Sequence, residues 1–228
     1  MVDETAKELP KLQSIQQKFI DGRSGNVSYK VETPVVYNCA LDDITINSDI
    51  KLILVADNPG RREQAAENRR YLVGPSGKIA AKFFRDNPAL GIDFYKNVII
   101  LNKTPIHSPR TLELRELCKL GGDTVAQEIK KSQISMAKLL LDFHETFAVP
   151  VFIIGYSEMK KGGIFEAYTT ELKIQYEQKP QMYKQLFFFR HFSMNQFTID
   201  LKKQALPEES VADSLVRIGS GYRQRILG

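Results

Sequence analysis

Short apolar runs punctuate this chain, and each run ends abruptly on polar residues. Three of them occupy residues 52–56, 98–101 and 186–189. The polar side chains that follow are, in order, Asp57 with Asn58, then Asn102, then Arg190 with His191. Continuous apolar runs of this length are typical of buried parallel strands. Because ligands bind beyond the carboxyl ends of such strands, we expect Asp57, Asn58, Asn102 and His191 to meet in one pocket.

Segments with helical spacing of apolar residues separate the runs. The predicted strands are 51–57, 97–102, 149–154 and 185–190, with a short β-like stretch at 35–37. The predicted helices are 5–20, 77–86, 111–119, 124–147, part of 158–178, 193–204 and 207–218. Strands that alternate with helices favour right-handed crossovers. The pattern therefore predicts an α/β fold, a three-layer α/β/α sandwich around a mostly parallel four-stranded sheet.

Local signals refine three of these helices. Ser76 is expected to cap the helix at 77–86, and Gly121-Gly122 to separate the third helix from the fourth. His144 is expected on the polar side of the long fourth helix. We expect a single domain over 1–228, with its core at about 50–204. An N-terminal helix and irregular segment (1–49) precede that core, and a C-terminal helix (205–228) follows it.

Composition narrows the class of protein. The 228 residues suffice for one α/β domain, and no apolar run reaches the roughly 18 residues of a membrane helix. No signal peptide is visible, and the two cysteines, Cys39 and Cys118, are too few for a disulfide framework or a cysteine-ligated cluster. We therefore expect a cytoplasmic monomer without a membrane partner. A net charge of +5 is compatible with a nucleic-acid partner.

Asp57 and Asn58 are the first candidates for chemistry. They lie between an apolar run and the Pro59-Gly60 turn, which exposes polar side chains at the rim of a sheet. A carboxylate can accept a proton from water, and an amide can position water. The alternative is an ordinary turn closed by an aspartate or asparagine side chain.

A second candidate lies at the start of the helix at 77–86. Gly74, Ser76 and Gly77 offer backbone N–H groups and a hydroxyl to an anion, although the spacing of a Walker motif is absent. Five basic residues occur within 18 positions, namely Arg61, Arg62, Arg69, Arg70 and Lys78. They form either a solvated loop or a surface for a nucleic-acid backbone.

Two further strand exits carry candidate side chains. The Asn102 amide offers one donor group and one acceptor, which suits the edge of a base. His191 can donate a hydrogen bond to a developing negative charge, and Ser193 can cap the next helix or contact a phosphate. A structural histidine and a strand-ending asparagine are the simpler alternatives. Without an HExxH motif or a Cys/His cluster, we expect no metal site.

The order of these motifs resembles the uracil-DNA glycosylase superfamily over residues 50–204. Ala56-Asp57-Asn58-Pro59-Gly60 is similar to its first motif, Gly-x-Asp/Asn-Pro-Gly/Tyr, or Gly-Glu-Ala-Pro-Gly in the iron–sulfur type. Arg62-Glu63 and the stretch 70–78 resemble the iron–sulfur type most closely. Leu101-Asn102 matches the asparagine that reads uracil. His191-Phe192-Ser193 is similar to the His-Pro-Ser motif, whose histidine stabilises the leaving base.

The resemblance also has departures. Ala56 replaces the first glycine, and Phe192 replaces the proline of His-Pro-Ser. The base-stacking phenylalanine falls on Leu72, with Tyr71 beside it as a substitute. The cysteines of the iron–sulfur cluster are missing, so no cofactor is expected.

The resemblance implies a role for each matched residue. Asp57, Asn58 and His191 are expected to be catalytic. Substrate binding is expected from Gly60, Tyr71, Leu72 and Asn102. Contacts to DNA are expected from Arg61, Arg62, Arg70, Ser76, Lys78, Ser193, Met194 and Asn195, with Met194 or Asn195 inserted into the duplex as a wedge.

Three functions remain open on the sequence. The first is a DNA glycosylase that excises uracil or a related deaminated base flipped out of damaged or uracil-containing DNA. The second is a catalytically inactive nucleic-acid-binding protein on the same fold, which the departures at Ala56, Leu72 and Phe192 favour. The third is a hydrolase of free nucleosides or nucleotides, which the anion-type turn favours.

Overall fold

A four-stranded parallel sheet forms the centre of the protein. The structure, a computed structural model, describes residues 2–22 and 28–228. Its strands are β1 (Leu52–Ala56), β2 (Val98–Asn102), β3 (Val151–Ile154) and β4 (Leu186–Phe189), in the order β2-β1-β3-β4. Every neighbouring pair is parallel. The predicted α/β fold is confirmed, and all the strands of the sheet are parallel.

The apolar runs form strands because helices bury the sheet. Every residue of β1, β3 and β4 is buried, whereas β2, one of the two edge strands, has two partly exposed positions. A strand buried on both faces needs apolar side chains at successive positions, which explains the continuous runs. The register pairs Ala56 of β1 with Asn102 of β2, so their carboxyl ends lie level.

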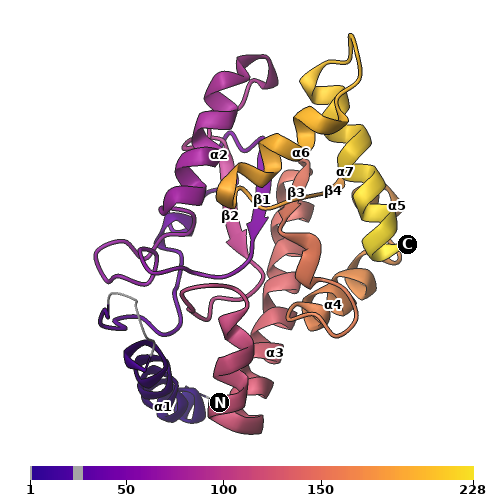
Figure 1. The fold of residues 1–228 in the computed structure, drawn as a ribbon. Coiled ribbons are helices and arrows are strands. Elements are labelled where there is room, and N and C mark those ends of the chain that lie inside the picture. Colours follow the sequence, from indigo (N-terminus) through magenta and orange to yellow (C-terminus); the bar gives the residue numbers. More distant parts are fainter. Residues whose placement is uncertain (1, 23–27) are drawn as a thin grey trace.

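Seven helices surround the sheet in the described part of the chain (Figure 1). They are α1 (Val2–Asp21), α2 (Pro75–Asp86), α3 (Glu113–Phe147), α4 (Glu166–Tyr176), α5 (Pro180–Lys184), α6 (Gln196–Gln204) and α7 (Val211–Leu227). In Figure 1, α1 and the first part of α3 lie at one end of the molecule, and α6 and α7 lie towards the other. None of these helices is long and apolar enough to cross a bilayer.

The two predicted helices at 111–119 and 124–147 share one label, α3, but this element consists of two helices joined at a kink. Gly122 has a non-helical backbone with φ of 65°, so the break expected at Gly121-Gly122 is confirmed. The two helices together carry the chain from the edge of the cavity described below to the start of β3.

His144 is not on a polar face, so that prediction was wrong. Its side chain is fully buried, because the segments that follow β3 cover this side of α3. Nδ1 lies 2.8 Å from the hydroxyl of Tyr176, and Nε2 lies 2.8 Å from Oε1 of Gln185. The imidazole thus ties α3 to α4 and to the residue before β4.

Some predicted boundaries moved. Helix α2 begins at Pro75 with Gly74 as its N-cap, so Ser76 lies inside the first turn and does not cap it. Helix α7 begins at Val211, where the Ser210 hydroxyl accepts a hydrogen bond from the N–H of Asp213, and it continues to Leu227. The β-like stretch at 35–37 is a single bridge between Val35 and Ile106.

Candidate functional site

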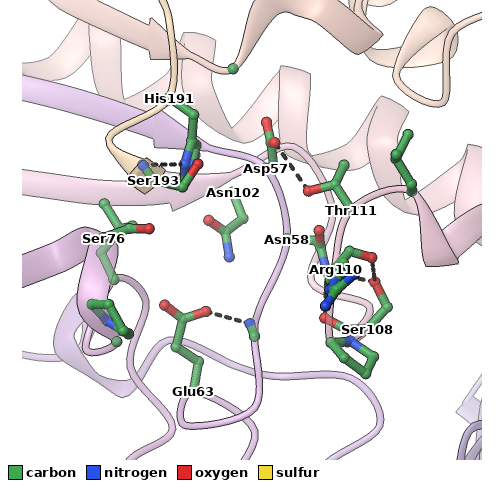
Figure 2. Close-up of a pocket in the computed structure, with 18 of the residues that line it drawn as sticks. Asp57, Asn58, Glu63, Ser76, Asn102, Ser108, Arg110, Thr111, His191 and Ser193 are labelled. Carbon is green, nitrogen blue, oxygen red and sulfur yellow. Dashed lines mark hydrogen bonds between the residues drawn. The ribbon is translucent and has the colours of Figure 1, made fainter. Parts of the chain in front are cut away.

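A cavity of about 930 Å³ opens where the carboxyl ends of the strands meet. Its wall includes Asp57 after β1, Asn102 at the end of β2, Gly155 after β3, and His191 after β4. Figure 2 shows Asn102 near the centre, with His191, Ser193 and Ser76 on one side and Asp57, Asn58 and Thr111 on the other. The parallel sheet therefore brings polar residues from distant segments to one place.

Asn102 presents a hydrogen-bonding group that the protein itself leaves unused. The residue is only 1% exposed, and its Nδ2 has no hydrogen-bond partner among the described residues. In Figure 2 this nitrogen points into the open space that faces Glu63. A buried donor without a partner costs about 1–3 kcal/mol, so it marks a position where a ligand acceptor gains binding energy.

The tautomer of His191 follows from its neighbour. The backbone N–H of Ser193 donates to Nδ1 of His191 over 3.0 Å, so Nδ1 carries a lone pair. The proton of the neutral ring is then on Nε2. Burial lowers the pKa of His191 below its usual 6.5, so the ring is neutral at pH 7. The site therefore holds a neutral N–H donor at this position.

Asn58 offers the cavity a hydrogen-bond acceptor rather than a donor. Its Nδ2 donates to the carbonyl of Ser108 over 3.2 Å and to the Ser108 hydroxyl over 3.0 Å. Because a carbonyl only accepts, these bonds fix which end of the amide is nitrogen. No described residue donates to Oδ1 of Asn58, which leaves this oxygen as an acceptor at the cavity wall.

Asp57 is held differently, by a buried cation. Nζ of Lys103 donates to Oδ1 of Asp57 over 2.6 Å, and the Thr111 hydroxyl donates to Oδ2 over 3.1 Å. Lys103 is fully buried, whereas the Asp57 side chain is 15% exposed. The carboxylate is therefore committed to protein partners on both oxygens, in contrast to the free oxygen of Asn58.

Glu63 lines the cavity opposite Asn102 (Figure 2). One oxygen of its carboxyl group accepts the N–H of Gly60 over 2.5 Å. Burial raises the pKa of Glu63 to about 7, and hydrogen bonds from the backbone of Gly60, Leu72 and Val73 counteract only part of that effect. The group therefore changes between acid and carboxylate near neutral pH.

The anion-type turn reaches the cavity. Gly74, Pro75 and Ser76 line its wall at the start of α2. Leu72 also lines it and has a left-handed backbone, with φ of 54°. A Cβ atom at Gly77 would lie 1.4 Å from the Leu72 carbonyl oxygen, so only glycine lets the helix start this close to the loop.

The remaining predicted site residues divide into those that line the cavity and those that do not. Gly60, Arg61, Arg62, Ser193 and the 80% exposed Met194 line the cavity. Four of the predicted site residues do not line it, namely Arg70, Tyr71, Lys78 and Asn195. The Tyr71 side chain is buried and its hydroxyl donates to the carbonyl of Val36, so the expected stacking substitute is a core residue. Arg70, Lys78 and Asn195 are exposed outside the cavity wall.

The structure adds residues that sequence reasoning did not assign to the site. They are Lys103, Glu63, Ser108, Arg110, Thr111, Tyr156, Glu158 and Arg190. Lys103 had a local signal, because a lysine directly after the last residue of a buried strand must find an acid or leave the core. The positions of the other residues depend on the conformation of the loops, which the hydrophobic periodicity of the sequence does not indicate.

No metal site is evident in the parts of the chain that the structure describes. No group of three or more His, Cys, Asp or Glu side chains there is placed to hold an ion. His107, which lies close to the first motif, is buried instead. Its Nδ1 lies 2.8 Å from the carbonyl of Pro59, and burial lowers its pKa to about 4.

No protein-family model matches the chain, and no curated protein matches it.

Proposed function

We propose that this protein is a DNA glycosylase that hydrolyses the N-glycosidic bond of uracil or a related deaminated base flipped out of DNA. The observation that carries the proposal is the unpartnered amide nitrogen of Asn102, buried at the centre of a 930 Å³ cavity. An asparagine amide supplies one donor group and one acceptor, which match the carbonyl and N–H groups along the edge of uracil. On this proposal, the base satisfies the donor that the protein leaves free.

His191 supports the same chemistry. A base leaves its sugar with the electron pair of the glycosidic bond and becomes an anion. The Nε2–H of His191, fixed by the hydrogen bond from Ser193, would donate to an oxygen of that anion. Removal of one such donor typically costs about 3–4 kcal/mol of activation free energy.

Asn58 is the better candidate for positioning water. Its Oδ1 is free to accept a hydrogen bond, whereas both oxygens of Asp57 are engaged. As the bond from C1′ to the base breaks, the water oxygen bonds to C1′ and releases a proton, which the departing base takes up. The sugar passes through an oxocarbenium-like state, as in other glycoside hydrolysis.

The surroundings of the cavity suit a nucleic-acid backbone. The exposed Arg61 and Arg62 lie beside the turn at the start of α2, whose backbone N–H groups can meet a phosphate. Met194 is 80% exposed in the loop that follows β4 and, on this proposal, fills the space that a flipped base leaves. We propose that the protein acts in this way as a monomer in the cytoplasm.

The direct test is incubation with uracil-containing oligonucleotides, followed by alkali to cleave abasic sites. Single-stranded, U·G and hypoxanthine substrates cover the deaminated bases. Asn102→Asp keeps the shape of the side chain but replaces the amide donor with an acceptor, so we expect at least a hundredfold loss of activity on uracil. His191→Ala should cause a similar loss. Asn47→Ala, at an exposed position outside the cavity wall, should retain full activity.

The outcomes separate the three functions. Cleavage that depends on Asn102 and His191 supports the glycosylase. Salt-sensitive binding to abasic DNA without cleavage would identify a binding protein, and turnover of free nucleosides alone would identify a small-molecule hydrolase. Cleavage that survives both substitutions would remove Asn102 and His191 from their proposed roles.

A further inference from the structure

Lys103 has no part in the reaction proposed above, although it follows Asn102 directly. Its side chain is fully buried. The ammonium group donates to Oδ1 of Asp57 and to the carbonyl oxygen of Ile154, each over 2.6 Å. It also lies 5.0 Å from the ring centre of Phe165. The group therefore connects the carboxyl ends of β1, β2 and β3 at the edge of the cavity.

Two further residues lie against the Asp57 carboxylate. Thr111, from the loop before α3, donates to Oδ2 over 3.1 Å. Gly155, directly after β3, packs against the carboxylate so closely that a Cβ atom there would lie 2.4 Å from Oδ1. These contacts fix the orientation of the carboxylate, and Lys103 compensates its charge.

The same pair of charges acts on His191. A negative charge near an imidazole favours the protonated ring, and a positive charge opposes it. At His191 the charge of Asp57 acts in the first direction and the charge of Lys103 in the second. The other ionisable side chains on the cavity wall are Arg61, Arg62, Glu63, Arg110, Tyr156, Glu158 and Arg190. Arg190 precedes His191 directly, and its Nε lies 3.4 Å from Oδ1 of Asp200.

The protonation state of His191 controls its orientation. Nδ1 accepts the N–H of Ser193, which begins the turn that carries Met194. A proton on Nδ1 would place two donors face to face and break this hydrogen bond. A neutral ring with its proton on Nε2 therefore keeps the hydrogen bond from the Ser193 N–H, at the start of the turn that carries Met194.

We propose that Lys103 is a positioning residue, which fixes the Asp57 carboxylate against Gly155 and Thr111 and cancels its charge beside His191. The consequence of this role of Lys103 for catalysis rests on the proposed function. On this proposal Asp57 has a structural role and Asn58 positions the water. His191 donates a hydrogen bond to the departing base as a neutral imidazole.

The test measures the pKa of His191 by NMR in the absence of any substrate. The chain has only three histidines, so the ring signals can be assigned by substitution. Lys103→Met should raise the pKa of His191 by about one pH unit, and Asp57→Asn should lower it. The double variant Asp57→Asn/Lys103→Met replaces the ion pair with neutral groups of similar size and should return the pKa to within a few tenths of the wild-type value.

Lys96→Met provides the matched control. Lys96 lies just before β2, at the other end of the same strand, and its side chain is 82% exposed. Its removal changes the net charge equally and should leave His191 unaffected. If Lys103→Met does not fold, because it leaves a buried charge unpaired, the double variant and Asp57→Asn still decide the question. A His191 pKa that is the same in wild type, Asp57→Asn and every folded Lys103 variant overturns the proposal.

Kinetics add a second readout. In Lys103→Met the acid limb of the pH–rate profile should move up by about one pH unit, with KM nearly unchanged, and the double variant should restore it. Failure to restore the limb in a folded double variant would contradict the electrostatic role. Altered His191 titration in a protein that cleaves no oligonucleotide would support the Lys103 inference and reject the glycosylase, so the two failures are distinguishable.

Discussion

At the scale of single residues, the side chains of the cavity divide into those that the protein satisfies and those that it leaves open. Asp57 and Lys103 satisfy one another, and Ser108 satisfies the nitrogen of Asn58. Asn102 retains an unpartnered buried nitrogen. Of the four buried side-chain atoms without a partner in the described residues, only the nitrogen of Asn102 belongs to a residue that lines the cavity, so it is the strongest single indication of ligand binding.

Glu63 gives a prediction about pH and stability. Burial raises the pKa of Glu63 from 4.5 to about 7 in the folded protein. Between these values the unfolded chain loses the proton while the folded protein keeps it, so the free energy of unfolding falls as the pH rises from about 4.5 to 7. Glu63→Gln cannot ionise and should lose this dependence.

The measurement is urea unfolding of both proteins at pH 5 and pH 8. The wild type should lose up to a few kcal/mol more than Glu63→Gln over this range. Parallel pH profiles of the two proteins would show that Glu63 ionises normally in the fold.

At the scale of elements, the approach of α2 to the preceding loop depends on Gly77. A Cβ atom there would overlap the Leu72 carbonyl oxygen, so Gly77→Ala must push the start of α2 away from Leu72. We expect a loss of about 2–3 kcal/mol in the free energy of unfolding. Gly74→Ala is the matched control, because a Cβ atom at Gly74 meets nothing within 4 Å. It should cost no more than about 1 kcal/mol. Equal losses would contradict the close approach.

The elements were predictable where burial dictates composition. The strands are confirmed with boundaries that moved by at most two residues, and most helices are confirmed, although α7 ends nine residues beyond its predicted end. Apolar runs and helical stripes follow directly from a sheet buried between helices. His144 shows the limit of this reasoning. A histidine among polar neighbours in the sequence is predicted to be exposed. The contacts of its two nitrogens with Tyr176 and Gln185 arise only from the tertiary fold.

The site was predictable in part for the same physical reason. Parallel strands place their carboxyl ends together, so Asp57, Asn102 and His191 were expected to converge, and they line one cavity. The partners of these residues were not predictable. Thr111 and Ser108 come from the loop before α3, and the path of that loop depends on packing rather than on periodicity.

At the scale of the whole molecule, the net charge of +5 matters only through its distribution. The exposed Arg61 and Arg62 lie at the cavity, so on the proposed function they neutralise phosphates there. Each phosphate contact contributes nearly one unit to the slope of log Kd against log salt concentration. Arg62→Ala should therefore reduce this slope by about one for DNA that contains an abasic site.

Fluorescence anisotropy over a salt series measures that slope. Lys96→Ala removes a charge outside the cavity wall and should leave it unchanged. Equal effects of the two substitutions would show that the protein binds DNA through its overall charge and not through the surface beside the cavity.

The exposed position of Met194 makes the cavity mouth sensitive to oxidants. Met136 and Met159 are buried and Met182 is partly buried, whereas the Met194 side chain is 80% exposed. Dilute peroxide should therefore convert Met194 to the sulfoxide before Met136, Met159 and Met182, replacing an apolar tip with a polar one. If that tip enters the duplex, oxidation should weaken binding to double-stranded DNA more than to single strands. Methionine sulfoxide reductase should reverse the loss, and Met194→Leu should resist it. Mass spectrometry of peptides locates the added oxygen.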